Sequence, residues 1–345
     1  PGDTEMEFAQ AQLALSLDDI QKDAIRTAIR SPMSVITGGP GTGKTTILRG
    51  ALALYQKRGL IVSLAAPTGR AARRLTETTG AEALTIHRLL EFSPKDECFS
   101  RNEERPLDAD VVVVDEVSMV DVPLMASLCR ALRPEASLLL VGDADQLPSV
   151  GPGLVLHDIL HSDRVPIVRL EHIYRQEDDS SIVVNAHKIL NGKQPEGPEQ
   201  GAPSDFYVMH LDNPEDIRSA IEVMVSKRIP ARFGLDPKTE VQVLVPMHRG
   251  QLGAEILNER LQGLLNPTGS PIPTKPGIRV GDRVIQTRNN YDLDVANGDV
   301  GIVQGPGAES DSIRVRFDTR DVTFPADSQD SLRLARPHKV PAHQT

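Results

Sequence analysis

The chain has 345 residues, which is enough for two domains and a small third one, each with its own core. Its composition is that of an ordinary globular protein, and its formal net charge of −10 argues against a surface that is basic throughout. The sequence has no apolar run of about 18 residues, and no basic segment followed by an apolar one near its start. Neither a membrane span nor a secretory signal is indicated, and we expect a cytoplasmic protein.

The first 15 residues are polar and begin with a proline, and we expect them to be disordered or the edge of a fragment. From residue 16 to about residue 170, apolar runs alternate with segments of helical periodicity. The expected strands cover residues 33–37, 60–66, 110–114, 137–141 and 165–169. This alternation predicts a first α/β domain, over residues 16–170, in which a parallel sheet carries helices on both faces.

A second α/β block is expected over residues 171–280. Its expected helices cover residues 181–190, 214–226 and 251–265, and its expected strands cover residues 206–210 and 241–245. Residues 281–332 contain four short strand candidates separated by turn residues, a pattern that predicts a small all-β barrel. These candidates are residues 282–286, 300–303, 313–317 and 322–324. Residues 333–345 lack apolar periodicity, and we expect a tail.

Residues 38–45 fit the pattern of a phosphate-binding loop, in which an early glycine is followed five residues later by Gly-Lys-Thr. Glycines are needed because the backbone must curl tightly enough to point several N–H groups at the phosphates. Lys44 is expected to reach the β- and γ-phosphates, and Thr45 to offer its hydroxyl to Mg²⁺. The predicted nucleotide-binding residues are Gly38, Gly39, Pro40, Gly41, Thr42, Gly43, Lys44, Thr45 and Thr46.

Two acidic residues, Asp115 and Glu116, follow a run of four valines that suits a central strand buried on both sides. At such a strand end the first carboxylate holds Mg²⁺, directly or through water, and the second polarises the attacking water. Acidic residues often follow strands, so the pair alone is a modest signal. Its position about 70 residues after the phosphate loop favours a hydrolase over a simple nucleotide binder.

Residues 142–150 read Gly-Asp-Ala-Asp-Gln-Leu-Pro-Ser-Val and follow the next expected strand. An amide such as that of Gln146 can sense the γ-phosphate without competing for the metal. Here the chain resembles the superfamily 1 helicases, whose third motif has the form Gly-Asp-x-x-Gln-Leu-Pro. The resemblance implies two RecA-like domains, with ATP and Mg²⁺ between them and single-stranded DNA across their tops.

Other segments resemble further motifs of this family in the same order. The resemblance implies that Gln21 reads adenine, although a glutamine on an exposed helix face is the alternative. Tyr174 would pack near the base, and Arg175 would approach the γ-phosphate from the cleft between the domains as a charge stabiliser. The residues that would contact DNA in the first domain are Pro67, Thr68, Gly69, Arg70, Thr85 and His87.

The resemblance narrows to the RecD-like branch, which translocates 5′ to 3′. It is carried by residues 67–72 and 85–90, by residues 245–253, and by residues 281–291 with 297–301. The last run opens the SH3-like barrel that this branch inserts into its second motor domain. Arg249 and Asn297 lie in these runs and are further candidates for DNA contact. Residues 91–107 sit where relatives carry a strand-separating pin, with a plain surface loop as the alternative.

Two motifs that the family carries after the barrel do not occur in this sequence: a DNA-gripping segment and a helix with a second arginine finger. We therefore expect the second RecA-like domain to be incomplete. An arginine finger accelerates phosphoryl transfer by about 10³ to 10⁵. On this basis we expect ATP binding to survive, and DNA-stimulated hydrolysis and unwinding to be severely reduced.

The sequence thus favours an ATP-dependent DNA helicase of the RecD-like type, acting in DNA repair or recombination. Its expected partners are single-stranded DNA and a duplex with a 5′ tail, with other repair proteins allowed and no membrane. One alternative is a non-catalytic remnant that binds ATP or DNA without turnover. Another is a phosphate-loop kinase or signalling ATPase, which would not require the runs around Gln146 and Arg175.

Overall fold

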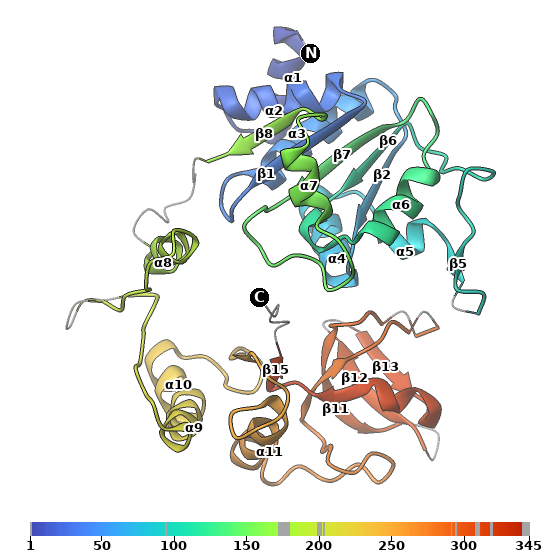
Figure 1. Ribbon diagram of the computed structural model, residues 1–345. Coiled ribbons are helices and arrows are strands. Elements are labelled where there is room, and N and C mark those ends of the chain that lie inside the picture. The colour runs from blue at the N-terminus through green and yellow to red at the C-terminus, as the bar shows by residue number, and fades with distance from the viewer. Residues whose placement is uncertain are drawn as a thin grey trace. The chain divides into compact units, whose positions relative to one another are not determined.

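The computed structural model describes residues 2–93, 95–171, 180–198, 202, 204–290, 292–293, 295–307, 311–317 and 320–339 (Figure 1). The chain divides into two compact units, and the division falls between Met209 and His210. The first unit holds the expected parallel sheet. The second unit holds the barrel together with helices and two short strands, so the barrel and the segment before it form one compact body.

The first unit is built on a six-stranded sheet whose order is β3-β2-β6-β7-β1-β8. Every neighbouring pair of strands is parallel, as predicted. The strands are β1 (Met33–Gly38), β2 (Val62–Ala66), β3 (Ala83–Thr85), β6 (Val111–Val114), β7 (Ser137–Gly142) and β8 (Ile167–Leu170). Because β6 is central, all four of its valines are buried, and they alternate between the two faces of the sheet.

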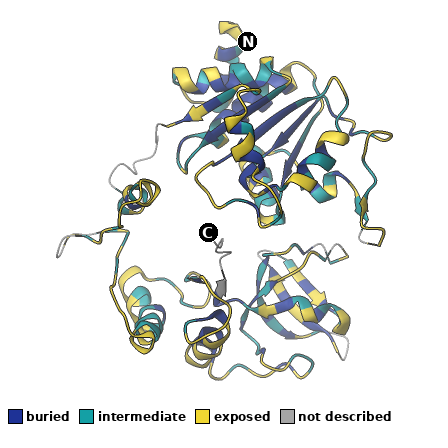
Figure 2. Ribbon diagram, in the orientation of Figure 1, coloured by how far each residue is buried: buried dark blue, intermediate teal, exposed yellow. Residues whose placement is uncertain are grey.

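Helices cover both faces of this sheet, and Figure 2 shows the buried strands in dark blue between helices that expose part of their surface. One core contains side chains of α2 (Asp19–Arg30), α3 (Lys44–Lys57) and α4 (Gly69–Thr79). The opposite core contains side chains of α5 (Ile86–Leu89), α6 (Val122–Arg130) and α7 (Val155–His161). Strands β1, β2 and β3 are each followed within a few residues by the start of a helix, which is α3, α4 and α5 respectively.

Residues 3–13 form helix α1 (Asp3–Leu13), so the expectation of disorder over residues 1–15 is wrong for this segment. Met6 and Ala9 are buried against α3, and the Arg58 guanidinium lies 3.0 Å from a carboxylate oxygen of Glu5. The polar composition hid this packing, because the buried residues recur only every three to four positions. The helix thus belongs to the core of the first unit.

The barrel of the second unit is a five-stranded antiparallel sheet of order β13-β12-β11-β10-β14. Its strands are β10 (Arg283–Gln286), β11 (Val300–Pro306), β12 (Ile313–Phe317), β13 (Arg320–Phe324) and β14 (Leu332–Leu334). Along β12, buried and exposed residues alternate, so Ile313, Val315 and Phe317 enter the core while the arginines between them face outward. A 3-10 helix (Ala326–Ser331) leads into β14.

The rest of the second unit contains α9 (Pro214–Val223), a π-helix (Met224–Arg228), α10 (Ile229–Phe233) and α11 (Ala254–Leu265). Strand β9 (Val243–Val245) pairs in parallel with β15 (Pro337–Lys339). The expected tail over residues 333–345 is therefore wrong over its described part, because β14 completes the barrel and β15 returns to the α/β body. Such short strands depend on backbone pairing and leave no periodic pattern in the sequence.

Helix α8 (Ser181–Leu190) forms where the sequence predicts it. The expected strand over residues 206–210 does not form. Tyr207 and Met209 remain about half exposed, and among the described residues no strand pairs with this segment. Within the described ranges, no helix is long and apolar enough to cross a membrane.

Candidate nucleotide and nucleic-acid site

The turn between β1 and α3 curls because two of its glycines adopt conformations that other residues avoid. Gly41 has φ 76° and Gly43 has φ 86°, and Gly43 is the N-cap of α3. At Gly38, a Cβ would lie 2.7 Å from the carbonyl oxygen of Leu170, so only glycine lets β8 approach. The free N–H groups of the first turn of α3 thus face the space in front of the loop.

Lys44 folds back over this loop. Its Nζ donates to the carbonyl oxygens of Gly38 and Gly39, the second at 2.8 Å. Burial lowers the pKa of Lys44, and the negative charges of Asp143, Glu116 and Asp115 oppose that shift. The Lys44 ammonium therefore lies in a partly desolvated site, where its attraction for an anion is screened less than in water.

Two carboxylates project at the end of β6. An oxygen of Asp115 accepts a hydrogen bond from the Glu116 N–H at 2.9 Å, and Glu116 has a left-handed backbone with φ 55°. Burial raises the pKa of both side chains, and the charge of Asp115 raises that of Glu116 further. A left-handed glutamate is a strained conformation that often marks a functional position.

The oxygen ligands present here fit a hard divalent cation such as Mg²⁺. The Thr45 hydroxyl and the Asp115 carboxylate line one pocket, and the raised pKa of Asp115 indicates a charge that a cation would stabilise. In the described part of the chain, no three metal-ligating side chains of the His, Cys, Asp or Glu type cluster together. Mg²⁺ commonly takes only one or two protein ligands, with substrate phosphates and water completing its shell.

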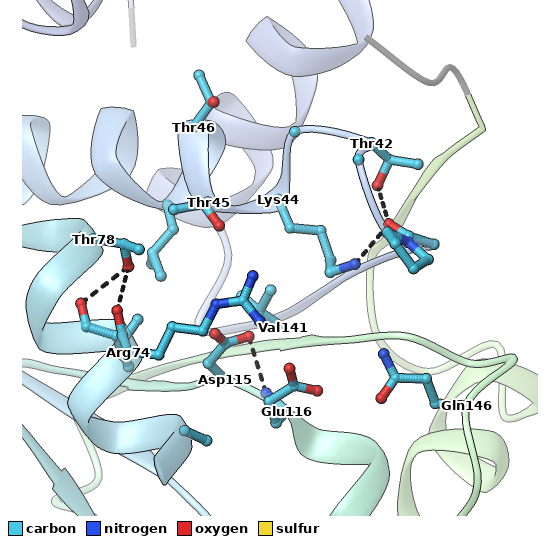
Figure 3. A pocket seen from close by; sticks show the side chains of 17 residues that line it. Thr42, Lys44, Thr45, Thr46, Arg74, Thr78, Asp115, Glu116, Val141 and Gln146 are labelled. Atoms are coloured by element: carbon cyan, nitrogen blue, oxygen red, sulfur yellow. Dashed lines mark hydrogen bonds between the residues drawn. The ribbon is translucent and has the colours of Figure 1, made fainter. Parts of the chain in front are cut away.

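The loop, the strand end and helix α4 enclose a pocket of about 360 Å³ (Figure 3). It brings together most of the predicted nucleotide residues and Gln146, whose Nε2 donates to the buried Asp143 carboxylate at 3.2 Å. Gly38 and Gln21 are not among its lining residues. Those residues are Gly39, Pro40, Gly41, Thr42, Gly43, Lys44, Thr45, Thr46, Leu48, Ala71, Arg74, Leu75, Thr78, Asp115, Glu116, Val141 and Gln146.

Sequence reasoning missed the contribution of α4, which presents one helix face to the pocket. Ala71, Arg74, Leu75 and Thr78 are spaced three or four residues apart and all line it. The sequence signal that could have indicated this contribution is that the helix follows directly after strand β2. In the structure β2 pairs with β6, which carries Asp115 at its end. A helix that starts at that edge of the sheet begins close to Asp115.

Gln21 lies in the first turn of α2 and is 4% exposed, which excludes the alternative of an exposed helix glutamine. Its side-chain oxygen accepts from the Asp18 N–H at 3.2 Å, and its own N–H donates to the Asp18 carboxylate at 2.8 Å. This capping box fixes the start of α2. A role in reading adenine stays a prediction, and Tyr174 and Arg175 lie outside the described residues.

The predicted DNA-contacting residues of the first unit gather after β2 and β3, which are neighbours in the sheet. Thr68 caps α4 by accepting from the Ala71 N–H at 3.2 Å, and Thr85 caps α5 by accepting from the Arg88 N–H at 3.1 Å. Pro67, Gly69 and Arg70 flank Thr68 in the sequence. Both threonine hydroxyls thus lie at one edge of the sheet.

His87 packs on a small hairpin formed by β4 (Phe92–Ser93) and β5 (Cys98–Phe99). Its ring lies 5.5 Å from that of Phe92 and 5.6 Å from that of Phe99. Burial lowers the pKa of His87, against the opposing charge of Asp121. Residues 91–107 therefore contain a short hairpin rather than a plain loop, and a strand-separating role for it remains a prediction.

Arg249 and Asn297 belong to the second unit, where both are exposed. The Asn297 N–H donates to the side-chain oxygen of Asn289 at 2.8 Å, which fixes the turn before β11. Their roles in binding DNA remain predictions.

The fold and this pocket define a nucleoside-triphosphate-binding protein of the phosphate-loop class. Residues 21–152 match the AAA domain family, and residues 257–317 match the ATP-dependent RecD-like DNA helicase SH3 domain. The chain belongs to the RecD-like family of superfamily 1 helicases.

Two curated relatives illustrate this membership. The chain is 40% identical over 285 residues to the ATP-dependent RecD2 DNA helicase of Deinococcus radiodurans, a match covering 82% of this chain and 37% of that protein. It is 34% identical over 319 residues to the RecBCD enzyme subunit RecD of Mycolicibacterium smegmatis, covering 82% of this chain and 56% of that one. The chain thus spans roughly a third to a half of the length of these relatives.

Solved structures share the fold. The Pif1 helicase from Bacteroides in complex with ADP-AlF3 and ssDNA superposes with a TM-score of 0.52 at 22% identity, covering 90% of this chain and 75% of that one. The Pif1 helicase from Candida albicans gives a TM-score of 0.52 at 19% identity, covering 94% and 86%.

Proposed function

We propose that this chain is the motor region of an ATP-dependent DNA helicase of the RecD-like type, which moves along single-stranded DNA from 5′ to 3′ in DNA repair or recombination. The observation that carries the proposal is the pocket at the carboxyl edge of the sheet, which Lys44, Asp115, Glu116 and Gln146 all line. The named relatives, an ATP-dependent DNA helicase and a subunit of the RecBCD enzyme, support the same activity.

In this proposal, the loop amides and Lys44 hold the phosphates of ATP, and Thr45 and Asp115 hold Mg²⁺. When bound, Mg²⁺ neutralises charge on the phosphates. Glu116 accepts a proton from water as the water oxygen bonds to the γ-phosphorus. The bond from that phosphorus to the bridging oxygen breaks, its electron pair stays on ADP, and the products are ADP and phosphate. The Gln146 amide contacts the γ-phosphate, and this contact is lost when the phosphate leaves.

Replacing the lysine of the loop tests the nucleotide part of the proposal. We expect Lys44→Ala to reduce ATP turnover by at least about 100-fold, because a charge that stabilises the transferred phosphoryl group is lost. Arg49→Ala removes an exposed cation from the same helix and is expected to leave turnover unchanged. The measurement is phosphate release with and without single-stranded DNA. Hydrolysis by Lys44→Ala at the unmodified rate would contradict the assignment.

The DNA part is tested separately with fluorescent single strands and tailed duplexes. Threonine hydroxyls at the sheet edge, together with exposed Arg70, suit contacts to the phosphate backbone, so affinity should fall steeply as salt rises. Unwinding is expected to be slow, and to require a duplex with a 5′ tail rather than one with a 3′ tail. If no DNA bound at low salt while ATP was hydrolysed, a phosphate-loop kinase or signalling ATPase would be the better reading.

A further inference from the structure

Helix α4 brings a second cation to the nucleotide pocket. Thr68 fixes its start by capping, and Leu75, which is 2% exposed, anchors it in the core. These two constraints set the rotation of the helix, so that Arg74 faces the pocket together with Ala71 and Thr78. Figure 3 shows the Arg74 side chain entering the space that also contains Asp115 and Glu116. The packing of α4 therefore sets the direction in which the Arg74 side chain leaves the helix, although that side chain is itself exposed.

The charges around the pocket indicate what Arg74 does there. Four of the lining residues carry charge, and the cations Lys44 and Arg74 balance the carboxylates Asp115 and Glu116. Without Arg74, the lining would carry one net negative charge before any phosphate arrived, which would oppose the binding of a triphosphate. The Arg74 charge also favours the ionised forms of both carboxylates.

The Arg74 guanidinium is available for a ligand. Within the described ranges, no hydrogen bond or ion pair engages it, whereas the Lys44 ammonium already donates to two loop carbonyls. A guanidinium offers a planar fork of donors that matches two phosphate oxygens at once. Asp115 and Glu116 line the same pocket and mark the end of it where the γ-phosphate is proposed to react.

We propose that Arg74 binds the γ-phosphate of ATP and neutralises the charge that its equatorial oxygens carry as the bond to the bridging oxygen breaks. This inference rests on the proposed function and adds a residue that the first unit supplies by itself. It separates Arg74 from Arg70 and Arg73, the other two cations of the basic run at residues 70–74, which do not line the pocket. Arg74 is therefore the residue of this run that we assign to nucleotide binding. The alternative is that Arg74 binds DNA.

The test compares Arg74→Ala and Arg74→Lys with Arg73→Ala, which removes the same charge from the adjacent position. Binding of a fluorescent non-hydrolysable ATP analogue and of fluorescent ADP is measured in the full chain without DNA. We expect Arg74→Ala to lower the affinity for the ATP analogue at least about tenfold and the affinity for ADP by less than about threefold, because only ATP carries the γ-phosphate. Arg74→Lys should recover part of the loss, and Arg73→Ala should change neither affinity.

Three results would overturn the inference. These are unchanged binding of the ATP analogue by Arg74→Ala, equal loss of both nucleotides together with a lower melting temperature, and, in a separate titration with single-stranded DNA, loss of DNA affinity with nucleotide binding intact. The last result would assign Arg74 to DNA. Lys44→Ala is measured alongside. If Lys44→Ala bound both nucleotides normally, the proposed function itself would fail. If Lys44→Ala lost nucleotide binding and Arg74→Ala did not, only the inference about Arg74 would fail.

Discussion

Asp115 carries a charge that the ligand-free protein holds at an energetic cost. Burial raises its pKa, so the folded state binds a proton more tightly than the unfolded chain does. The contribution of Asp115 to stability is then fully present below its pKa in the unfolded chain, and it is lost as the pH rises through the raised pKa of the folded state. At neutral pH the ionised carboxylate therefore destabilises the fold that presents it, which is the usual relation between a binding site and stability.

Removing that charge should stabilise the folded chain and weaken its binding of ATP and Mg²⁺. At pH 7.5 and without nucleotide, we expect Asp115→Asn to raise the melting temperature by about 2 to 4 °C, the shift that about 1 kcal/mol gives in a domain of this size. The gain should shrink as the pH falls, because Asp115 itself then takes up a proton. Adding ATP and Mg²⁺ should stabilise the variant less than the unmodified chain.

Asp145→Asn is the matched control, because Asp145 is exposed and is not among the lining residues. A lower melting temperature for Asp115→Asn at pH 7.5 would contradict the argument. So would a nucleotide-induced rise as large as that of the unmodified chain.

Among the helices, α1 shows how a polar segment can be integral to a core. Ala9 is fully buried, while Ala11 is exposed on the same helix. We expect Ala9→Asp to destabilise the first unit by about 3 kcal/mol, because it buries a carboxylate without a partner. Ala11→Asp should change stability by less than about 0.5 kcal/mol. Urea unfolding monitored by circular dichroism measures both, and equal effects would show that α1 is not docked.

The motifs and the long elements were predictable from sequence, and the short or rotationally defined ones were not. The phosphate loop and Asp115 were found because phosphate and metal chemistry restrict the residue types at fixed spacing. Arg74 was missed because the face that a helix presents depends on its packing, here on Leu75. β15 was missed because a three-residue strand is defined by its backbone partner. The segment 206–210 misled because alternation alone does not supply a neighbouring strand.

In the second unit, one buried side chain secures the return of the chain from the barrel. Asn258 accepts from the Arg336 N–H at 3.1 Å and donates to the carbonyl oxygen of Pro337 at 2.9 Å. We expect Asn258→Ala to cost about 2 kcal/mol, because it leaves two backbone groups without partners. Hydrogen exchange over residues 335–339 should then speed up. Glu259→Ala, at an exposed neighbour, should have no effect. Unchanged exchange in Asn258→Ala would show that this contact does not hold β15.

The pairing of β15 with β9 also constrains the order in which the strands of this unit can pair during folding. The side chain of Gln242, next to β9, donates to the carbonyl oxygen of Arg336, 94 positions later, at 2.7 Å. Strands β11, β12 and β13 instead pair consecutively. Closing a long loop costs conformational entropy that short-range pairing avoids. During synthesis on the ribosome, β9 therefore has an unpaired edge until the barrel and β15 have been made. In that interval this edge is open to chaperone binding and to aggregation.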